Sequence, residues 1–210
     1  ETTIRMLGVT GACAAAGLVI GGITMTGLAS KFSYMAFAVA GDFTFLALVL
    51  SAAVTIILGL GMPTPSAYVL AAVLIGPTLT GDFGIPLLNA HLFLMYFAVM
   101  SAMTPPVAVA AYAAAAIAQA NPLAIAVMAV RFSIVAFVIP FSFVYAPSVL
   151  TPSAEPMVLF HIATVTLATV TLAVAVEGLL AGRIAPVPRL AAIAGALCLF
   201  SASVEAAVAG

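Results

Sequence analysis

The charged residues of this chain are few, and the gaps between them are long. No Asp, Glu, Lys or Arg occurs over residues 43–81 or 83–130, stretches of 39 and 48 residues. A helix needs about 20 apolar residues to cross the hydrocarbon core of a bilayer. Each stretch is therefore long enough for two helical pieces, whereas the charge-free runs 6–30, 132–154 and 156–176 each fit one crossing.

The overall composition indicates the same environment. Of the 210 residues, 66% are hydrophobic and 5% are charged, whereas a soluble domain carries about 25% charged residues. The five Lys and Arg residues are scattered along the chain, so they form no basic face for nucleic acid. We therefore expect an all-α polytopic membrane protein that is surrounded by the lipid bilayer and has no nucleic-acid partner.

The first long stretch is interrupted by glycine and proline. Helical arms are expected over 43–60 and 67–80, and the sequence GLGMPTPS at 59–66 lies between them. Its glycines tolerate unusual backbone angles, and its prolines lack the N–H that a continuing helix needs. A break is therefore predicted between about residues 59 and 66. The lengths of the arms allow two full crossings or a hairpin that re-enters the membrane from one side.

The second long stretch repeats this plan. Helical pieces are expected over 87–102 and 107–119, and the sequence SAMTPP at 101–106 interrupts them. The second piece of about 13 residues is about 20 Å long, which is too short to span a bilayer alone. We therefore expect one crossing helix that is broken near its middle.

Helix breaks at membrane depth suit the binding of ions. Backbone that leaves its helix there has to be satisfied by protein or water, so such breaks commonly line a cavity. The C-terminal end of a half-helix offers carbonyl oxygens to a cation such as Na⁺. Thr64, Ser66 and Thr104 add hydroxyl oxygens without burying a charge. The paired breaks predict a secondary transporter, and proline kinks that bind nothing are the alternative.

The rest of the chain is less distinctive. We expect a first helix over 6–29, an interfacial arm over 31–41, a helix over 122–145 kinked by Pro140, and final helices over 157–180 and 190–208. Arg183 and Arg189 place the loop between the final helices in the cytoplasm by the positive-inside rule, and Arg131 falls on the same side. For Glu177, snorkelling or pairing is the simplest interpretation, with a proton relay as the alternative.

No enzyme motif is present in the sequence. It contains no His-Glu-x-x-His, no Gly-x-Ser-x-Gly and no pair of aspartates inside a predicted helix. An intramembrane enzyme is therefore disfavoured, and no organic cofactor is expected. A membrane scaffold subunit that does not transport, whose helix breaks bind nothing, stays open as a second class.

At the helix breaks the sequence resembles the large membrane component of tripartite ATP-independent periplasmic (TRAP) transporters. The closer resemblance is to the fused permease type that works with TAXI-type binding proteins. The resemblance extends over about residues 10–150 and rests on five segments: AAAGLVIGGITMTG at 14–27, LGLGMPTPSAY at 58–68, AHLFLMYF at 90–97, TPPVAVAAYAAA at 104–115 and PFSFVYAP at 140–147.

The resemblance implies a fold. The family belongs to an ion-transporter superfamily of elevator transporters, in which each inverted repeat has a re-entrant helical hairpin and a broken helix. Residues 1–150 would be the second-repeat permease core, with the hairpin at about 43–81 and the broken helix at about 87–119. Residues 151–210 would be a C-terminal pair of transmembrane helices.

The resemblance also implies ion-binding residues, because family ion sites lie where the hairpin tip and the helix break meet. The corresponding residues of this chain are Gly59, Gly61, Pro63, Thr64, Ser66, Ser101, Thr104 and Pro105. The usual family pattern at the tip is Gly-Leu-Pro-Thr-Thr, whereas this chain reads Gly-Met-Pro-Thr-Pro, so Pro65 replaces a hydroxyl there.

The function that follows is ion-coupled transport across the cytoplasmic (inner) membrane. A periplasmic TAXI-type solute-binding protein would deliver a small solute resembling an organic acid, and Na⁺ would be the coupling ion, with H⁺ as the rival. The chain begins with Glu1, and no signal-peptide pattern precedes the first predicted helix. We expect a C-terminal fragment of the permease that lacks the N-terminal repeat; a processed N-terminus is the alternative.

Overall fold

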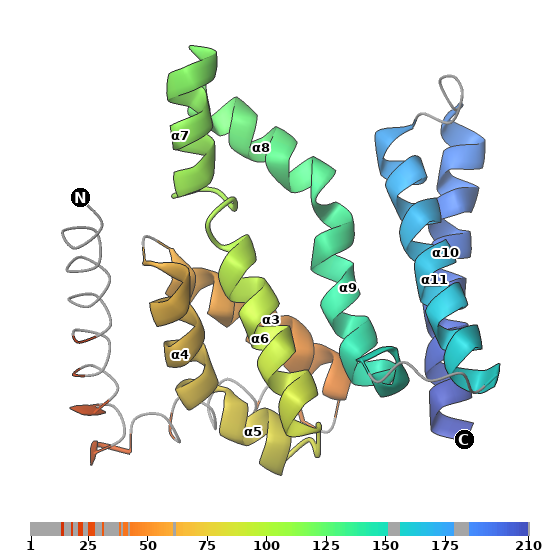
Figure 1. Ribbon diagram of the computed structural model, residues 1–210, viewed down its shortest axis with the longest axis horizontal. Coiled ribbons are helices and arrows are strands. Elements are labelled where there is room, and N and C mark those ends of the chain that lie inside the picture. The colour runs from red at the N-terminus through yellow and green to blue at the C-terminus, as the bar shows by residue number, and fades with distance from the viewer. Residues whose placement is uncertain are drawn as a thin grey trace. The chain divides into compact units, whose positions relative to one another are not determined.

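The computed structural model describes residues 43–60, 62–150, 156–178 and 185–209, with scattered positions between 14 and 41. The regular structure of these residues is helical, as the sequence predicts (Figure 1). The chain divides into two compact units, Glu1–Ala126 and Val127–Gly210. The predicted first helix and interfacial arm fall almost wholly outside the described residues. The expected boundary at residue 150 stays a prediction.

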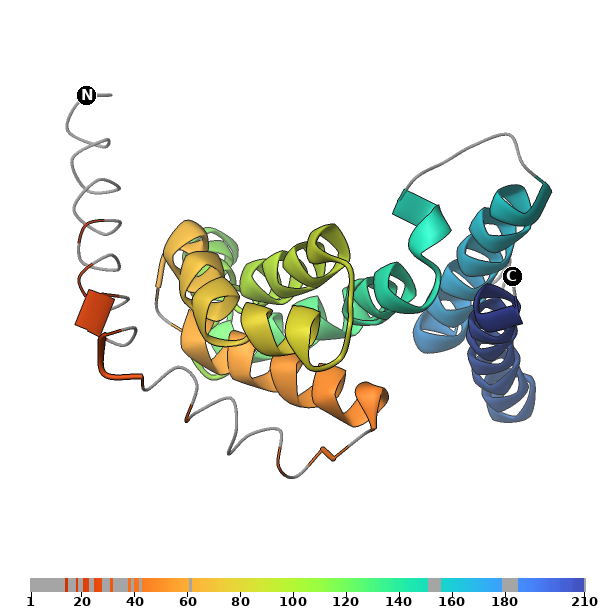
Figure 2. The ribbon, with the colours of Figure 1, turned by 90° about the horizontal axis from the view of Figure 1, so that it is seen from below.

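Three helices of the first unit pack on one another. They are α3 (Thr44–Gly59), α4 (Thr64–Leu74) and α6 (Leu87–Met100), and each contacts the other two. The short helix α5 (Gly76–Gly81) follows α4 and also contacts α6. Figures 1 and 2 show these elements gathered in one group. The two halves of the first long apolar stretch therefore form a helical hairpin that packs against the start of the second stretch.

Small residues on α3 allow this close packing. Its buried face repeats every fourth residue, with Ala47, Ser51, Thr55 and Gly59 on one ridge. Residues of this size let the backbones of neighbouring membrane helices approach each other. Helix α6 supplies the bulk on the other side, since side chains such as Phe93 are fully buried there.

The second arm of the hairpin differs from its prediction. It begins at Thr64, three residues earlier than expected, because Pro65 lies in the first helical turn, where a missing N–H costs nothing. The arm is also not continuous to residue 80, since α4 ends at Leu74 and α5 begins at Gly76. Pro77 explains this interruption, because it has no N–H to donate to the carbonyl four residues back and its ring crowds that carbonyl.

The broken helix continues in α7 (Val109–Ala118), close to its predicted range. After α7 the chain turns at Gln119, which has a φ of 52°, and α8 (Pro122–Phe132) begins. The Asn121 side chain caps α8, because its Oδ1 accepts from the N–H of Leu123 at 2.9 Å. The axes of α7 and α8 differ by 118°. A small alanine cluster joins the two helices: Ala108, Ala111 and Ala126, with Ile125 packed against it.

The second unit continues with α9 (Ile134–Tyr145) and the 3₁₀ helix η1 (Pro147–Leu150). The predicted helix over 122–145 is wrong as a single element, because Ser133 separates α8 from α9 and Pro140 lies inside α9. The N–H of Ala136 donates to the carbonyl of Ser133, three residues back, so the chain is tightened upstream of the proline.

Two long helices complete this unit. They are α10 (Pro156–Glu177) and α11 (Pro186–Ala209), which pack against each other. Helix α11 begins earlier than the predicted residue 190, because prolines are accommodated in a first helical turn.

Among the described residues, α10 is long and apolar enough to cross a membrane by itself. The bent pair α7–α8 would be a second span if its two helices together form one crossing. The helices α3, α4, α6 and α9 are apolar but shorter. The structure is consistent with a membrane protein, and the predicted number of crossings stays a prediction.

The alanine cluster gives a test of this packing. Ala111 is buried against α8, whereas Ala114 on the same helix is exposed. We expect Ala111→Leu to lower the free energy of unfolding by about 1–3 kcal/mol, because the added carbons have no space. Ala114→Leu should change it by less than about 0.5 kcal/mol. Thermal unfolding of the purified permease in detergent measures both, and equal effects would contradict the packing of α7 on α8.

Candidate functional site

The tip of the hairpin is a tight link between α3 and α4. The N–H of Leu60 donates to the carbonyl of Ile57 at 3.2 Å, and that of Met62 donates to Gly59 at 3.3 Å. Pro63 is in an extended conformation and leads directly into α4. Gly61, at the centre of the link, lies outside the described residues. The break predicted within 59–66 is confirmed, and it is confined to the residues between Gly59 and Thr64.

The break between α6 and α7 runs from Ser101 to Ala108, as the double proline predicts. Its start is tightened, because the N–H of Thr104 donates to the carbonyl of Ser101 at 3.3 Å, three residues back. Its end is closed by the N–H of Ala110, which donates to the carbonyl of Ala102 at 3.0 Å. Ala108 is fully buried with a φ of 38°, a left-handed conformation that is uncommon for a residue with a Cβ.

The hairpin tip and the helix break touch at Gly59 and Ser101. A Cβ added to Gly59 would lie 2.6 Å from the Cβ of Ser101 and would overlap its Oγ. The same position is 3.5 Å from the Cβ of Ala67 on α4. The C-terminal ends of α3 and α6 and the start of α4 therefore meet at one point, and only a glycine fits there.

The hydroxyl groups at this junction differ in their partners. Ser101 Oγ donates to the carbonyl of Ala98 at 2.7 Å, and Thr104 Oγ1 donates to Met100 at 2.8 Å. Each oxygen keeps lone pairs that can accept or coordinate. Ser66 is 4% exposed, and its Oγ has no hydrogen-bond partner. An unsatisfied buried hydroxyl costs about 1–3 kcal/mol, so Ser66 is the strongest candidate ligand of the site.

The remaining predicted site residues belong to the tip and the break themselves. Pro63 is exposed before α4, Thr64 is half-buried in the first turn of α4, and Pro105 is half-buried after Thr104. The structure thus places the described members of the predicted set on two adjoining turns, with the contact between Gly59 and Ser101 as their link.

Sequence reasoning missed two buried hydroxyls on α3. Ser51 and Thr55 are 1% and 0% exposed, and each donates to the carbonyl four residues back at 2.7 Å. Their spacing of four from each other and from Gly59 was the available signal, because it places small residues on one packed ridge.

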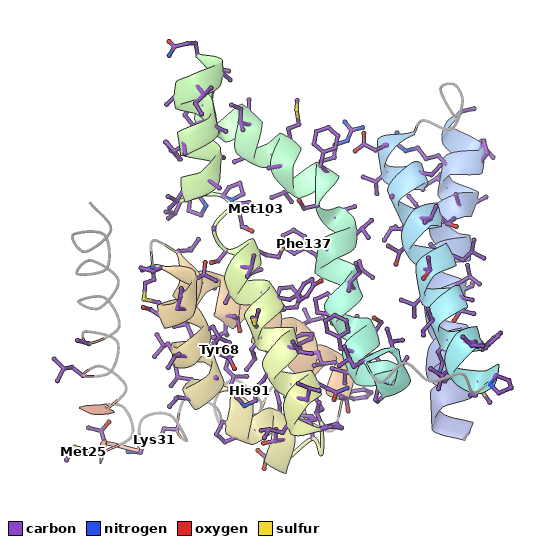
Figure 3. All side chains as sticks on the ribbon, in the orientation of Figure 1. Met25, Lys31, Tyr68, His91, Met103 and Phe137 are labelled. Carbon is purple, nitrogen blue, oxygen red and sulfur yellow. The ribbon has the colours of Figure 1, made fainter. Side chains whose placement is uncertain are left out.

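Sequence reasoning also missed the pairing of Tyr68 with His91. Tyr68 Oη and His91 Nδ1 are 2.8 Å apart, and the two rings meet edge to face at 6.0 Å between centroids (Figure 3). This hydrogen bond joins α4 to α6. The sequence did not predict this pair, because nothing in it brings positions 23 apart together.

The chemistry of the junction is that of neutral oxygens. In the described part of the chain, no group of three or more His, Cys, Asp or Glu side chains is placed to hold a metal ion. What the junction offers is hydroxyl groups and the carbonyl oxygens at two helix ends, which suit a hard monovalent cation.

Apolar helices that are broken at glycine and proline are typical of membrane transport proteins, as is the contact between the tip of a hairpin and the break in a neighbouring helix. The family model "Tripartite ATP-independent periplasmic transporter, DctM component" matches residues 1–158. Because this match covers most of the chain, the chain belongs to the DctM family. No curated protein and no solved structure matches it.

This membership defines the general role of the protein. The DctM family consists of inner-membrane components of transporters, and it is not an enzyme family. They act in secondary transport of solutes, together with a periplasmic binding protein and a small permease. The predicted resemblance to TRAP permeases is therefore confirmed at the level of the family.

The contact between the tip and the break predicts a strong effect of Gly59→Ala. We expect a loss of about 1–3 kcal/mol in the free energy of unfolding, because the new methyl group collides with Ser101. Gly76→Ala is the matched control, since no atom lies within 4 Å of the added Cβ. Thermal unfolding should show that Gly76→Ala is tolerated and that adding Ser101→Gly to Gly59→Ala restores part of the loss. Purely additive effects of the two substitutions would refute the contact.

The pairing of Tyr68 with His91 predicts a smaller effect. Tyr68→Phe removes one half-buried hydrogen bond and should lower the free energy of unfolding by about 0.5–1.5 kcal/mol. Tyr112→Phe serves as the control, because Tyr112 is 49% exposed on α7. Denaturation of both variants at one pH compares them, and indistinguishable stabilities would show that the bond contributes nothing.

Proposed function

We propose that this chain is the second repeat of a TRAP permease and that its junction of tip and break binds Na⁺ as the coupling ion of solute import. The observation that carries the proposal is Ser66, whose buried Oγ has no hydrogen-bond partner. Ser66 lies in the first turn of α4 beside Ala67, which approaches Gly59 at the junction. A cation at the junction would give that hydroxyl oxygen a ligand role and offset its loss of hydration.

The choice of Na⁺ follows from the type of ligand. Helices α3 and α6 both end at the junction, so two negative helix ends outnumber the one positive end of α4 there. Carbonyl and hydroxyl oxygens coordinate a hard cation without a change in protonation. Coupling to H⁺ is the rival, and its candidate group is His91 on α6, whose Nδ1 is engaged with Tyr68 of the hairpin.

The rest of the transport system follows from the family. We propose that a TAXI-type periplasmic protein delivers a small solute resembling an organic acid, and that the first repeat of the permease completes the solute site. In this arrangement α3 and α4 are a re-entrant hairpin, since at about 24 Å and 16 Å both arms are shorter than the hydrocarbon core. The hairpin and the broken helix would then move together as part of an elevator domain.

Ser66→Ala tests the ion site directly. We expect the Na⁺ concentration for half-maximal uptake by the complete transporter to rise about tenfold, since one oxygen ligand is lost. Stability without Na⁺ should not fall, because the removed hydroxyl has no partner in the protein. The measurements are solute uptake in proteoliposomes and thermal unfolding across a range of Na⁺ concentrations.

Ser51→Ala is the matched control for this experiment. Its hydroxyl is equally buried but donates to the carbonyl of Ala47. That variant should change stability slightly and leave the Na⁺ dependence unchanged. An unchanged Na⁺ dependence in Ser66→Ala would overturn the site, and a permease that Na⁺ neither stabilises nor activates would favour proton coupling or a scaffold role.

A further inference from the structure

Two arginines from different helices converge on the C-terminal end of α10. Arg189 of α11 donates through Nε to the carbonyl of Ala175 and through Nη2 to the carbonyl of Val176. Arg131, in the last turn of α8, donates through Nη2 to the same carbonyl of Val176 at 3.4 Å. Gly178, with a φ of 70°, ends the helix, and the position of its missing Cβ is 3.1 Å from Arg189 Nη1. All of these residues lie in the second unit.

This arrangement holds two positive charges against one carbonyl oxygen. Guanidinium groups stay protonated, so their mutual repulsion is permanent. The nearest acidic residue in sequence, Glu177, supplies at most one negative charge against the two positive ones, and its buried Oε1 has no hydrogen-bond partner. The end of α10 attracts cations through its helix dipole, which is equivalent to only about half an elementary charge. The pair therefore has excess positive charge, and the chemistry it favours is a doubly accepting oxyanion such as a phosphate group.

The helical turns that carry the two arginines also carry large exposed apolar side chains. Phe132, next to Arg131, is 64% exposed, and Leu190, next to Arg189, is 67% exposed. Val187, two residues before Arg189 on α11, is 76% exposed. A guanidinium on a helical turn with large exposed apolar side chains suits the boundary between headgroups and acyl chains, where the charge meets a phosphate and the apolar side chains meet the lipid tails.

The position along the membrane is consistent with this environment. Helix α10 has 22 residues and is about 33 Å long, so its C-terminal end lies at one surface of the bilayer when the helix spans it. The positive-inside rule predicts that this end is cytoplasmic, because Arg183 and Arg189 follow it. The cytoplasmic leaflet is the one whose anionic lipids attract arginine and lysine.

We propose that Arg131 and Arg189 bind the phosphate of an anionic phospholipid headgroup at the C-terminal end of α10. The planar guanidinium groups present paired N–H donors that match two oxygens of one phosphate. The N–H groups that do not bond to the carbonyls of α10 are the ones that serve the lipid. The site fixes the end of the membrane-spanning helix to one leaflet, and it is independent of the ion site in the first unit.

The experiment uses the complete permease in nanodiscs of phosphatidylcholine with and without phosphatidylglycerol. Thermal unfolding and native mass spectrometry report stabilisation and retained lipid. The wild type should be stabilised by phosphatidylglycerol and should retain it on release from the nanodisc. Arg131→Gln should bind phosphatidylglycerol about five- to tenfold more weakly than the wild type. Arg131→Lys should bind it with an affinity between those of the wild type and Arg131→Gln, because lysine keeps the positive charge but lacks the paired N–H donors of a guanidinium.

The same measurements separate the alternatives. If Arg131 only caps α10, Arg131→Gln lowers stability equally in both lipid mixtures, and the proposal fails. If inorganic phosphate added to phosphatidylcholine nanodiscs stabilises the wild type as much as phosphatidylglycerol does, the site takes soluble phosphate, and the lipid is excluded as its source. Arg189→Lys provides a second variant that keeps the charge at the more buried position, and it should weaken lipid binding without unfolding α10.

Discussion

The packing of the first unit depends on the close contact between Gly59 and Ser101. The end of α3 approaches the end of α6 so closely that no Cβ fits between them. That distance fixes how α3, α4 and α6 pack, because the hairpin can reach the break only if its facing side chains are small. It also determines the chemistry of the junction, since the ends of two helices meet there with the first turn of α4, which carries the buried Ser66 hydroxyl. The packing of these helices and the candidate site thus both depend on the absence of a side chain at Gly59.

The two units use helix ends in different ways. In the first unit, the ends of α3 and α6 meet hydroxyl groups and carbonyls, which leaves a neutral junction suited to a monovalent cation. In the second unit, the end of α10 meets two arginines and becomes positive. Both arrangements follow from the same property, the C-terminal carbonyls that a helix leaves to partners outside its own regular hydrogen-bond pattern. Membership of the DctM family makes the chain part of a transporter; the proposed roles of the two arrangements within it are ion binding for the first and attachment to anionic lipid for the second.

Much of the fold could be predicted because apolar length and proline position act locally. The break at Thr104-Pro-Pro and the helix before it were predicted almost to the residue, since proline removes a backbone donor whatever surrounds it. The errors arose where the position of a proline within its helix mattered. Pro65 was accepted in a first turn, Pro77 divided the second arm, and Pro140 did not mark the interruption, which falls at Ser133. The sequence alone does not show whether a proline will lie in the first turn of a helix or in its interior.

The sequence by itself determined the class of protein, the two helix breaks and the family, because composition and proline chemistry need no knowledge of neighbours. It also named Ser66, Ser101 and Thr104, but it could not rank them. Only the tertiary structure decided that Ser101 and Thr104 have partners in their own helix and that the buried Ser66 has none. The same holds for Tyr68 with His91 and for Arg131 with Arg189, which lie far apart in sequence. Hydrogen-bond partners are set by how helices pack, and packing depends on contacts that no local pattern records.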